Sequence, residues 1–208
     1  MSRIPPTASD HPATWKFDYP IYHPATREAW RTWLEAHQDD PTGVWVMSWR
    51  RAAGRATVDY ESIVEEALCV GWIDSTVNVF DEERGLQLIT PRKPRSTWAP
   101  SNKARVARLE AEGRIGPGGR RAIEVAKANG WWNILDDVEA LLEPDDLAAA
   151  LTEVPAAREA WDGFPPSARK QMLFWIVSAV REDTRRRRID AVVEKAAVGE
   201  RARGAEQG

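Results

Sequence analysis

The chain contains few of the residues that build disulfides and metal sites, with one cysteine and three histidines in 208 residues. A single cysteine excludes an intramolecular disulfide and fits a reducing cytoplasm, which is where we expect the protein. Cys69 lies in the apolar stretch 67–70, so we predict a buried, unreactive thiol. The three histidines, His11, His23 and His37, lack the close spacing of a structural metal site. We therefore expect neither a metal nor another cofactor.

Long apolar runs and an excess of charge are also missing. The longest aliphatic and aromatic run is 172–177, whereas a membrane helix needs roughly 20 residues, so we expect no membrane span. Residues 1–20 lack the apolar core of a signal peptide and are predicted to form a flexible leader. The net charge of −3 argues against a globally basic protein that binds nucleic acid. The common signatures of phosphate loops, nucleophile elbows and zinc proteases do not occur either.

Tryptophan is the residue type that the chain has in surplus, with 11 copies beside three tyrosines and four phenylalanines. Its large side chain and indole N–H suit it to packing, to stacking and to interfaces. The composition therefore indicates a folded protein without showing which of these roles the tryptophans have.

The spacing of apolar residues predicts an α+β fold: a small antiparallel sheet of about three strands backed by helices, followed by a helical C-terminal module. A helix over 26–37 precedes a strand over 44–49, and Asp59 caps a second helix that ends before Gly71. A hairpin then joins strands over 72–80 and 85–90. The remaining predicted helices cover 102–112 (capped by Ser101), 117–129, 144–151, 156–161, 166–180 and 183–198.

The hairpin register determines which side chains face the core. If Phe80 pairs with Gly85, then Ile73, Val77 and Val79 lie on the core face with Leu86 and Leu88. The same register places Asp74 opposite Pro91 and within ion-pair reach of Arg92 or Lys93.

The elements suggest four segments. We predict the leader over 1–20, a mixed α+β portion over 21–133, a helical module over 144–200 and a frayed tail over 201–208.

The densest chemistry falls at the start of the hairpin and after its end. Six residues there form the predicted ligand site: Trp72, Asp74, Arg92, Lys93, Trp98 and Asn102. They are consistent with a pocket for an anionic or polar ligand with an aromatic wall. Two other interpretations stay open, namely a structural salt bridge packed on Trp98, and an enzyme with Asp74 as base and Arg92 as anion clamp.

A second candidate is the Arg-rich Gly-Pro turn over 113–121, which resembles the helix-hairpin-helix motif of DNA-binding proteins. Arg114, Arg120 and Arg121 would contact phosphate in that alternative, although the glycines are spaced differently from the motif. The adjacent carboxylates Glu65 and Glu66 are predicted to be surface charges. The arginine run over 185–188 is predicted to surround a helix instead of forming one patch.

The motifs Trp72-Ile73-Asp74 and Thr90-Pro91-Arg92-Lys93-Pro94 also carry a family resemblance, as do parts of the helical tail around Trp175-Ile176 and Arg188-Ile189. Across residues 22–200 the chain is similar to the bacteriocin-protection family, also called YdeI or OmpD-associated proteins. The resemblance implies a non-catalytic binding or stress-protection protein. Together with the predicted ligand site, it leads us to expect a small anionic ligand or a protein as the partner. It supplies no catalytic residues, and the chain departs from the family pattern at 116–119.

Overall fold

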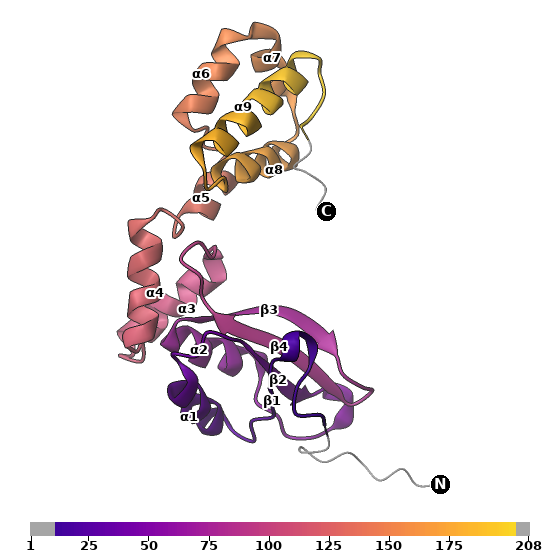
Figure 1. Cartoon of the computed structure of the whole chain (residues 1–208), viewed down its shortest axis with the longest axis vertical. Coiled ribbons are helices and arrows are strands. Elements are labelled where there is room, and N and C mark those ends of the chain that lie inside the picture. Colours follow the sequence, from indigo (N-terminus) through magenta and orange to yellow (C-terminus); the bar gives the residue numbers. More distant parts are fainter. Residues whose placement is uncertain (1–10, 203–208) are drawn as a thin grey trace. The chain divides into compact units, whose positions relative to one another are not determined.

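The computed structural model describes residues 11–202, and Figure 1 shows the course of the chain. Its contacts divide the chain into two compact units, the first ending at Asn129 and the second beginning at Gly130. Each unit has its own core, and the two are described separately.

A four-stranded sheet is the centre of the first unit. Its strands are β1 (Ile21–Tyr22), β2 (Val44–Trp49), β3 (Trp72–Val79) and β4 (Arg84–Pro91), in the order β1-β2-β4-β3. β1 pairs with β2 in parallel, and the other pairs are antiparallel. The α+β class is confirmed, but the prediction of about three antiparallel strands is wrong. β1 has only two residues, so it is too short to show the alternation of apolar and polar residues that marks a strand in sequence.

The helices of the first unit begin and end where local signals place them. In α1 (Arg27–His37) the hydroxyl of Thr26 accepts a hydrogen bond from Ala29 N at 3.1 Å. Asp59 caps α2 (Tyr60–Val70) in the same way, and Gly71 ends that helix with a φ of +85°. α3 (Pro100–Ala111) has a proline at its start, so the prediction of Ser101 as its cap is wrong. α4 (Pro117–Ala128) follows, and short 3-10 turns cover Lys16–Asp18 and Arg51–Ala53.

Both faces of the sheet are covered. Helices α1 and α2 pack on the face that carries Val44, Val46, Trp72 and Ile89. The opposite face carries Trp45, Met47, Leu86 and Leu88, which pack against Trp15, Tyr19 and Phe80.

The segment before β1 covers the sheet face that carries Trp45 and Met47. The indole of Trp45 donates a hydrogen bond to the Lys16 carbonyl at 3.0 Å. We predicted a flexible leader over residues 1–20. Its described part, residues 11–20, packs on the sheet instead, because Trp15 and Tyr19 bury apolar surface there. The rest of the predicted leader, residues 1–10, lies outside the described residues.

The hairpin register differs from the predicted one. Val79 pairs with Gly85, and a bulge between Asp74 and Val77 shifts the register again, so that Asp74 lies opposite Ile89 instead of Pro91. Leu86 and Leu88 are core residues as predicted, but Val77 and Val79 are 70% and 64% exposed. An extra residue in one strand turns the following side chains to the other face, and the sequence pattern contains no signal for it.

The second unit is helical, as predicted. Its helices are α5 (Ile134–Glu139), α6 (Asp145–Glu153), α7 (Pro155–Gly163), α8 (Pro166–Val177) and α9 (Glu182–Ala197). Its fully buried core residues include Leu147, Leu151, Trp161, Leu173, Ile176 and Val192.

Three details of the second unit differ from expectation. α5 lies between residues 134 and 143, where we predicted no element. Its six residues are too few to show a helical period. α8 ends at Val177 and not at residue 180 as predicted, and Val180 is exposed. Ala202, in the predicted frayed tail, packs against the core, and residues 203–208 lie outside the described residues.

Several arginine–carboxylate contacts connect the helices and loops of the second unit. Glu143 accepts hydrogen bonds from Arg158, Arg169 and the indole of Trp161. In the arginine run of α9, Arg185 pairs with Asp146. Arg188 donates to the carbonyl of Trp175, whereas Arg186 and Arg187 face solvent. The run surrounds its helix, as predicted.

Candidate functional site

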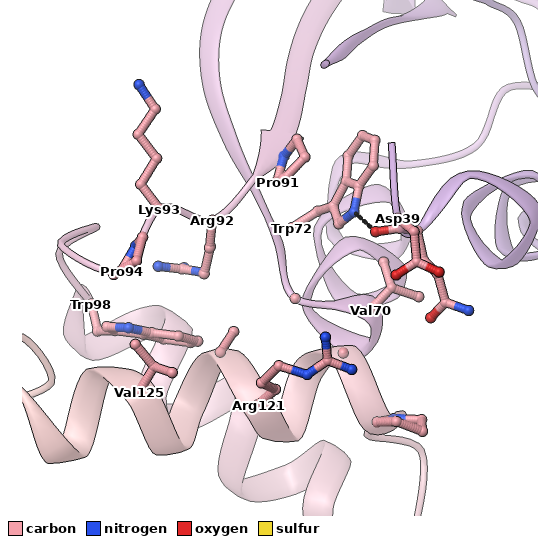
Figure 2. Close-up of a pocket in the computed structure, with 15 residues that line it drawn as sticks. Asp39, Val70, Trp72, Pro91, Arg92, Lys93, Pro94, Trp98, Arg121 and Val125 are labelled. Carbon is pink, nitrogen blue, oxygen red and sulfur yellow. Dashed lines mark hydrogen bonds between the residues drawn. The ribbon is translucent and has the colours of Figure 1, made fainter. Parts of the chain in front are cut away.

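A pocket of about 360 Å³ lies in the first unit where β4 ends (Figure 2). Four separate parts of the chain line it: the turn after α1, the α2–β3 junction, the segment after β4, and α4. The lining residues are Gln38, Asp39, Val70, Gly71, Trp72, Pro91, Arg92, Lys93, Pro94, Trp98, Pro117, Gly118, Arg121, Ala122 and Val125. Its volume is in the range of small-molecule sites.

Hydrogen bonds hold the segment after β4 in place. Arg92 N donates to the Gly71 carbonyl at 3.0 Å, which fixes the segment beside the end of α2. Ser96 N donates to the Lys93 carbonyl at 2.9 Å and closes a turn. The side-chain amide of Asn129 donates to the Pro94 carbonyl at 2.7 Å, so the end of α4 anchors the same turn. The positions of Arg92 and Lys93 thus follow from backbone contacts.

Arg92 is the most unusual residue of the pocket. Its guanidinium lies over the Trp98 ring, 3.5 Å from the centroid, and Nη1 donates to the Thr97 carbonyl at 3.1 Å. Its Nε and Nη2 are buried and have no hydrogen-bond partner within residues 11–202. Burial lowers the pKa of Arg92 to about 10, and the charge of Asp74 opposes that shift only in part. A cation whose N–H groups are desolvated without a hydrogen-bonded counter-charge is costly, so the site favours an anion.

Two further cations and one acid line the pocket. In the part of the chain that the structure describes, the side chains of Lys93 and Arg121 form no ion pair. Asp39 supplies the acid. Figure 2 shows Arg121 rising from α4 on the side of the pocket where Asp39 lies, and Arg92 and Lys93 on the other side. Three cations against one carboxylate make the pocket electropositive.

The structure brings four of the six predicted ligand-site residues together. Trp72, Arg92, Lys93 and Trp98 line the pocket, whereas Asp74 and Asn102 do not. Trp72 and Trp98 are each only 1% exposed, so they support the wall instead of offering open stacking faces. Trp72 also donates its indole N–H to the Gln38 carbonyl at 3.3 Å.

The predicted ion pair between Asp74 and Arg92 or Lys93 does not form. Asp74 instead accepts hydrogen bonds from the Tyr60 hydroxyl at 2.9 Å and from the Gln87 amide at 3.3 Å. The physical reason is the bulge in β3, which sets Asp74 opposite Ile89. Asn102 Oδ1 accepts a hydrogen bond from Arg105 at 2.9 Å and so belongs to a different cluster.

The three arginines of the nucleic-acid alternative have different surroundings. Arg114 pairs with Glu65, Glu66 and Glu112, and Arg120 donates to the Ile115 carbonyl. Only Arg121 faces the pocket. Sequence reasoning assigned Arg121 to phosphate contact and missed Asp39. The helical spacing of Pro117, Gly118, Arg121, Ala122 and Val125 is the signal that could have placed Arg121 on one face with the pocket wall.

The glycines of the same turn serve helix packing. A Cβ atom at Gly119 would lie 2.6 Å from the Cys69 carbonyl oxygen, and one at Gly118 would lie 2.5 Å from that of Val70. Gly116 N donates to the Cys69 carbonyl at 2.9 Å. The start of α4 therefore lies directly against the end of α2, and this contact accounts for the Gly-rich sequence.

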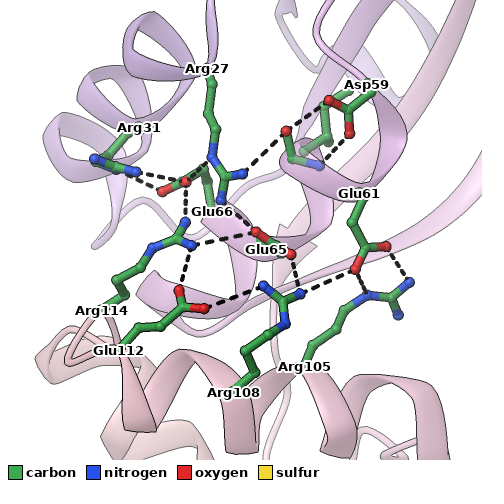
Figure 3. A network of polar contacts seen from close by, with 12 residues as sticks. Arg27, Arg31, Asp59, Glu61, Glu65, Glu66, Arg105, Arg108, Glu112 and Arg114 are labelled. Carbon is green, nitrogen blue, oxygen red and sulfur yellow. Dashed lines mark hydrogen bonds and ion pairs between the residues drawn. The ribbon is translucent and has the colours of Figure 1, made fainter.

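A buried ion-pair network, shown in Figure 3, lies beside this helix contact. Glu65 and Glu66 are 3% and 1% exposed, so the prediction of surface charges is wrong. Glu65 pairs with Arg27, Arg108 and Arg114, and Glu66 pairs with Arg27, Arg31 and Arg114. The sequence pattern around Glu65 and Glu66 gives no sign that these side chains are buried. Arginines from α1, from α3 and from the turn after α3 enclose them, which only the tertiary structure shows.

The arginines keep both carboxylates ionised. Burial opposes ionisation of Glu66, but hydrogen bonds from Arg31 and Arg27 outweigh it and lower the pKa of that carboxyl. The pKa of Glu65 is lowered in the same way against the effect of burial, mainly by Arg108 and Arg27. The network thus joins α1, α2 and α3 by charges that stay paired at neutral pH.

Cys69 lies beside the network, at a cavity of about 300 Å³ that Arg31, Glu66 and Arg114 also line. The thiol is buried as predicted, and burial raises its pKa to about 11.

We expect the Cys69 thiol to react with Ellman's reagent at pH 7.5 at least about 100-fold more slowly in the folded protein than in guanidinium chloride, because the thiolate is the reactive form. Absorbance at the thionitrobenzoate band measures both rates. Rapid labelling of the folded protein would contradict the buried position.

Within residues 11–202, no helix combines the length and the hydropathy that a bilayer span requires. Among the same residues, no group of three or more His, Cys, Asp or Glu side chains is placed to hold a metal ion.

Comparison with protein families gives two matches, one in each unit. Residues 141–199 match the family described as bacteriocin-protection, YdeI or OmpD-associated. Residues 22–122 match a domain of unknown function (DUF8412). Searches of curated proteins and of solved structures found no match. The resemblance to the bacteriocin-protection family is confirmed for the helical unit. The motifs at 72–74 and 90–94, which also suggested that family, fall within the other match.

Proposed function

We propose that the first unit binds a small organic anion in the pocket after β4, and that the protein is a non-catalytic binding protein. The observation that carries the proposal is Arg92, a half-buried cation whose Nε and Nη2 atoms are closed to solvent and have no partner among the described residues. Other arginines of this unit show what such a group normally has, because Arg27, Arg31, Arg105, Arg108 and Arg114 all pair with carboxylates. An anionic ligand would supply the negative group that pairs with Arg92.

The arrangement of Asp74 supports binding over catalysis. An enzyme that used Asp74 as base and Arg92 as anion clamp would need both at one cavity, but Asp74 does not line the pocket. It is engaged by Tyr60 and Gln87 instead. The contact between Arg92 and Trp98 does join the hairpin to the segment before α3, so these residues have a structural role beside the proposed one.

The helical unit supports a role in stress protection. Its similarity to the bacteriocin-protection family is the basis for that part of the proposal. A cytoplasmic location belongs to the same proposal and rests on the free thiol of Cys69.

The proposal can be tested with 1-anilinonaphthalene-8-sulfonate, which has an apolar body and one negative charge. We expect saturable fluorescence enhancement on the full chain. Arg121→Ala and Lys93→Ala should each weaken binding by about 5-fold or more, because each removes one cation from the pocket wall. The measurement is a fluorescence titration at low salt.

Arg95→Ala is the matched control, because Arg95 is an exposed cation of the same segment that does not line the pocket. Its titration should match that of the wild type. Equal affinity in all four proteins would show that the dye binds elsewhere, and the proposed pocket would then have no support.

A further inference from the structure

We infer that the pocket takes a monocarboxylate with an apolar body, whose two carboxylate oxygens are held by the Nε–Nη2 edge of Arg92. The inference rests on the proposed function and narrows it to one class of ligand.

The contacts of Arg92 leave one edge of its guanidinium for a ligand. Nη1 is engaged by the Thr97 carbonyl at 3.1 Å, and one face of the group lies on the Trp98 ring. Nε and Nη2 remain without hydrogen-bond partners in the described part of the chain. These two nitrogen atoms lie on the same side of the planar group, so their N–H bonds run parallel. Such a fork matches two oxygens of one acid group.

Other arginines of this chain use the same edge for the same purpose. Arg31 binds Glu66 through Nε and Nη2, both at 2.8 Å. Arg105 binds Glu61 through these atoms at 2.9 and 2.7 Å, and Arg185 binds Asp146 at 2.6 and 2.7 Å. In each pair the edge holds both oxygens of a carboxylate. Arg92 presents this edge without its carboxylate.

The number of buried charges favours a monoanion. Arg92 is the most buried cation of the pocket, with Nε and Nη2 closed to solvent, whereas Lys93 and Arg121 are exposed and keep contact with water. One buried positive charge compensates one buried negative charge, so the second charge of a phosphate dianion would be desolvated without a partner. Asp39 adds a negative charge at the rim that further disfavours a dianion.

The rest of the lining suits an apolar body. Val70, Pro91, Pro94 and Val125 present aliphatic surface to the pocket. Because Nε and Nη2 are closed to solvent, the carboxylate reaches them only after a local shift of Arg92 or of its neighbours. We therefore expect a ligand that combines one carboxylate with a ring or a short aliphatic chain.

Three probes of similar shape test the inference on the full chain: benzoate, benzamide and phenylphosphonate. At pH 8.5, where the phosphonate is largely a dianion, titration calorimetry should show benzoate binding at least about 10-fold more tightly than either of the others. This comparison uses only the wild-type protein, so it does not depend on the folding of a variant.

The Arg92→Lys variant tests the fork itself, because lysine keeps the charge and loses the paired N–H groups. Its affinity for benzoate should fall at least about 10-fold, while Arg95→Lys should leave it unchanged. Phenylphosphonate binding as tightly as benzoate, or benzoate binding Arg92→Lys as well as the wild type, would overturn the carboxylate inference. In that case the dye titration still decides the proposed function on its own.

Discussion

Replacing Glu66 with glutamine is expected to lower the free energy of unfolding by about 3–5 kcal/mol. Glutamine keeps the shape of the side chain but removes the negative charge that Arg27, Arg31 and Arg114 share. Glu66 is only 1% exposed, so water cannot solvate the N–H groups that lose their carboxylate partner at this position. Urea denaturation followed by far-UV circular dichroism measures the change.

Glu112→Gln is the matched control for this substitution. Glu112 contacts Arg108 and Arg114 of the same network, but its side chain is 40% exposed. Solvent screens such a pair, so the expected loss is below about 1 kcal/mol. Equal losses in the two variants would contradict the view that burial makes the Glu66 charge important.

The effect of Glu66→Gln should also depend on pH. The pKa of Glu66 in the folded protein is lowered from 4.5, because hydrogen bonds from Arg31 and Arg27 outweigh burial. Its ionised form therefore stabilises the fold above about pH 4.5, and this contribution is lost as the pH falls through the folded-state pKa. The difference between the wild type and the variant should be full at pH 7 and should narrow in acid.

Gly71→Ala is expected to cost about 2–5 kcal/mol, since two effects combine there. The backbone φ of Gly71 is +85°, which costs an alanine about 1–2 kcal/mol. The added Cβ would also lie 2.6 Å from the Gly118 carbonyl oxygen, which is backbone and cannot turn away. Thermal and urea unfolding measure the loss.

Gly113→Ala separates the two effects. Gly113 has a φ of +68°, and nothing lies within 4 Å of its added Cβ. Its expected cost is therefore that of the backbone conformation alone, about 1–2 kcal/mol. If both variants lose the same amount, the close approach of α2 and α4 contributes nothing.

The sequence predicts those parts of the fold that local chemistry determines. Asp59 and Gly71 set the two ends of α2 through groups a few residues away, and both were predicted correctly. The bulge in β3 and the parallel strand β1 depend on partners distant in the chain, and both were missed.

The same distinction holds for the site. Arg92, Lys93, Trp72 and Trp98 are close in sequence to the hairpin, so its pairing alone was enough to group them. Asp39 and Arg121 come from separate elements, and the burial of Glu65 and Glu66 requires three helices at once. Adjacent carboxylates on a helix look the same in sequence whether they face water or arginines.

The pocket is assembled from segments that span residues 38 to 125, and this has a practical consequence for finding its natural ligand. All of these segments contribute to the lining, so a compound that fills the cavity binds the folded first unit in preference to the unfolded chain. Such a compound raises the apparent stability by RT ln(1 + [L]/Kd), which is about 2.7 kcal/mol at 100 times Kd. The unfolding equilibrium itself therefore reports binding, and metabolite mixtures can be screened by melting temperature without a label or an assumed activity.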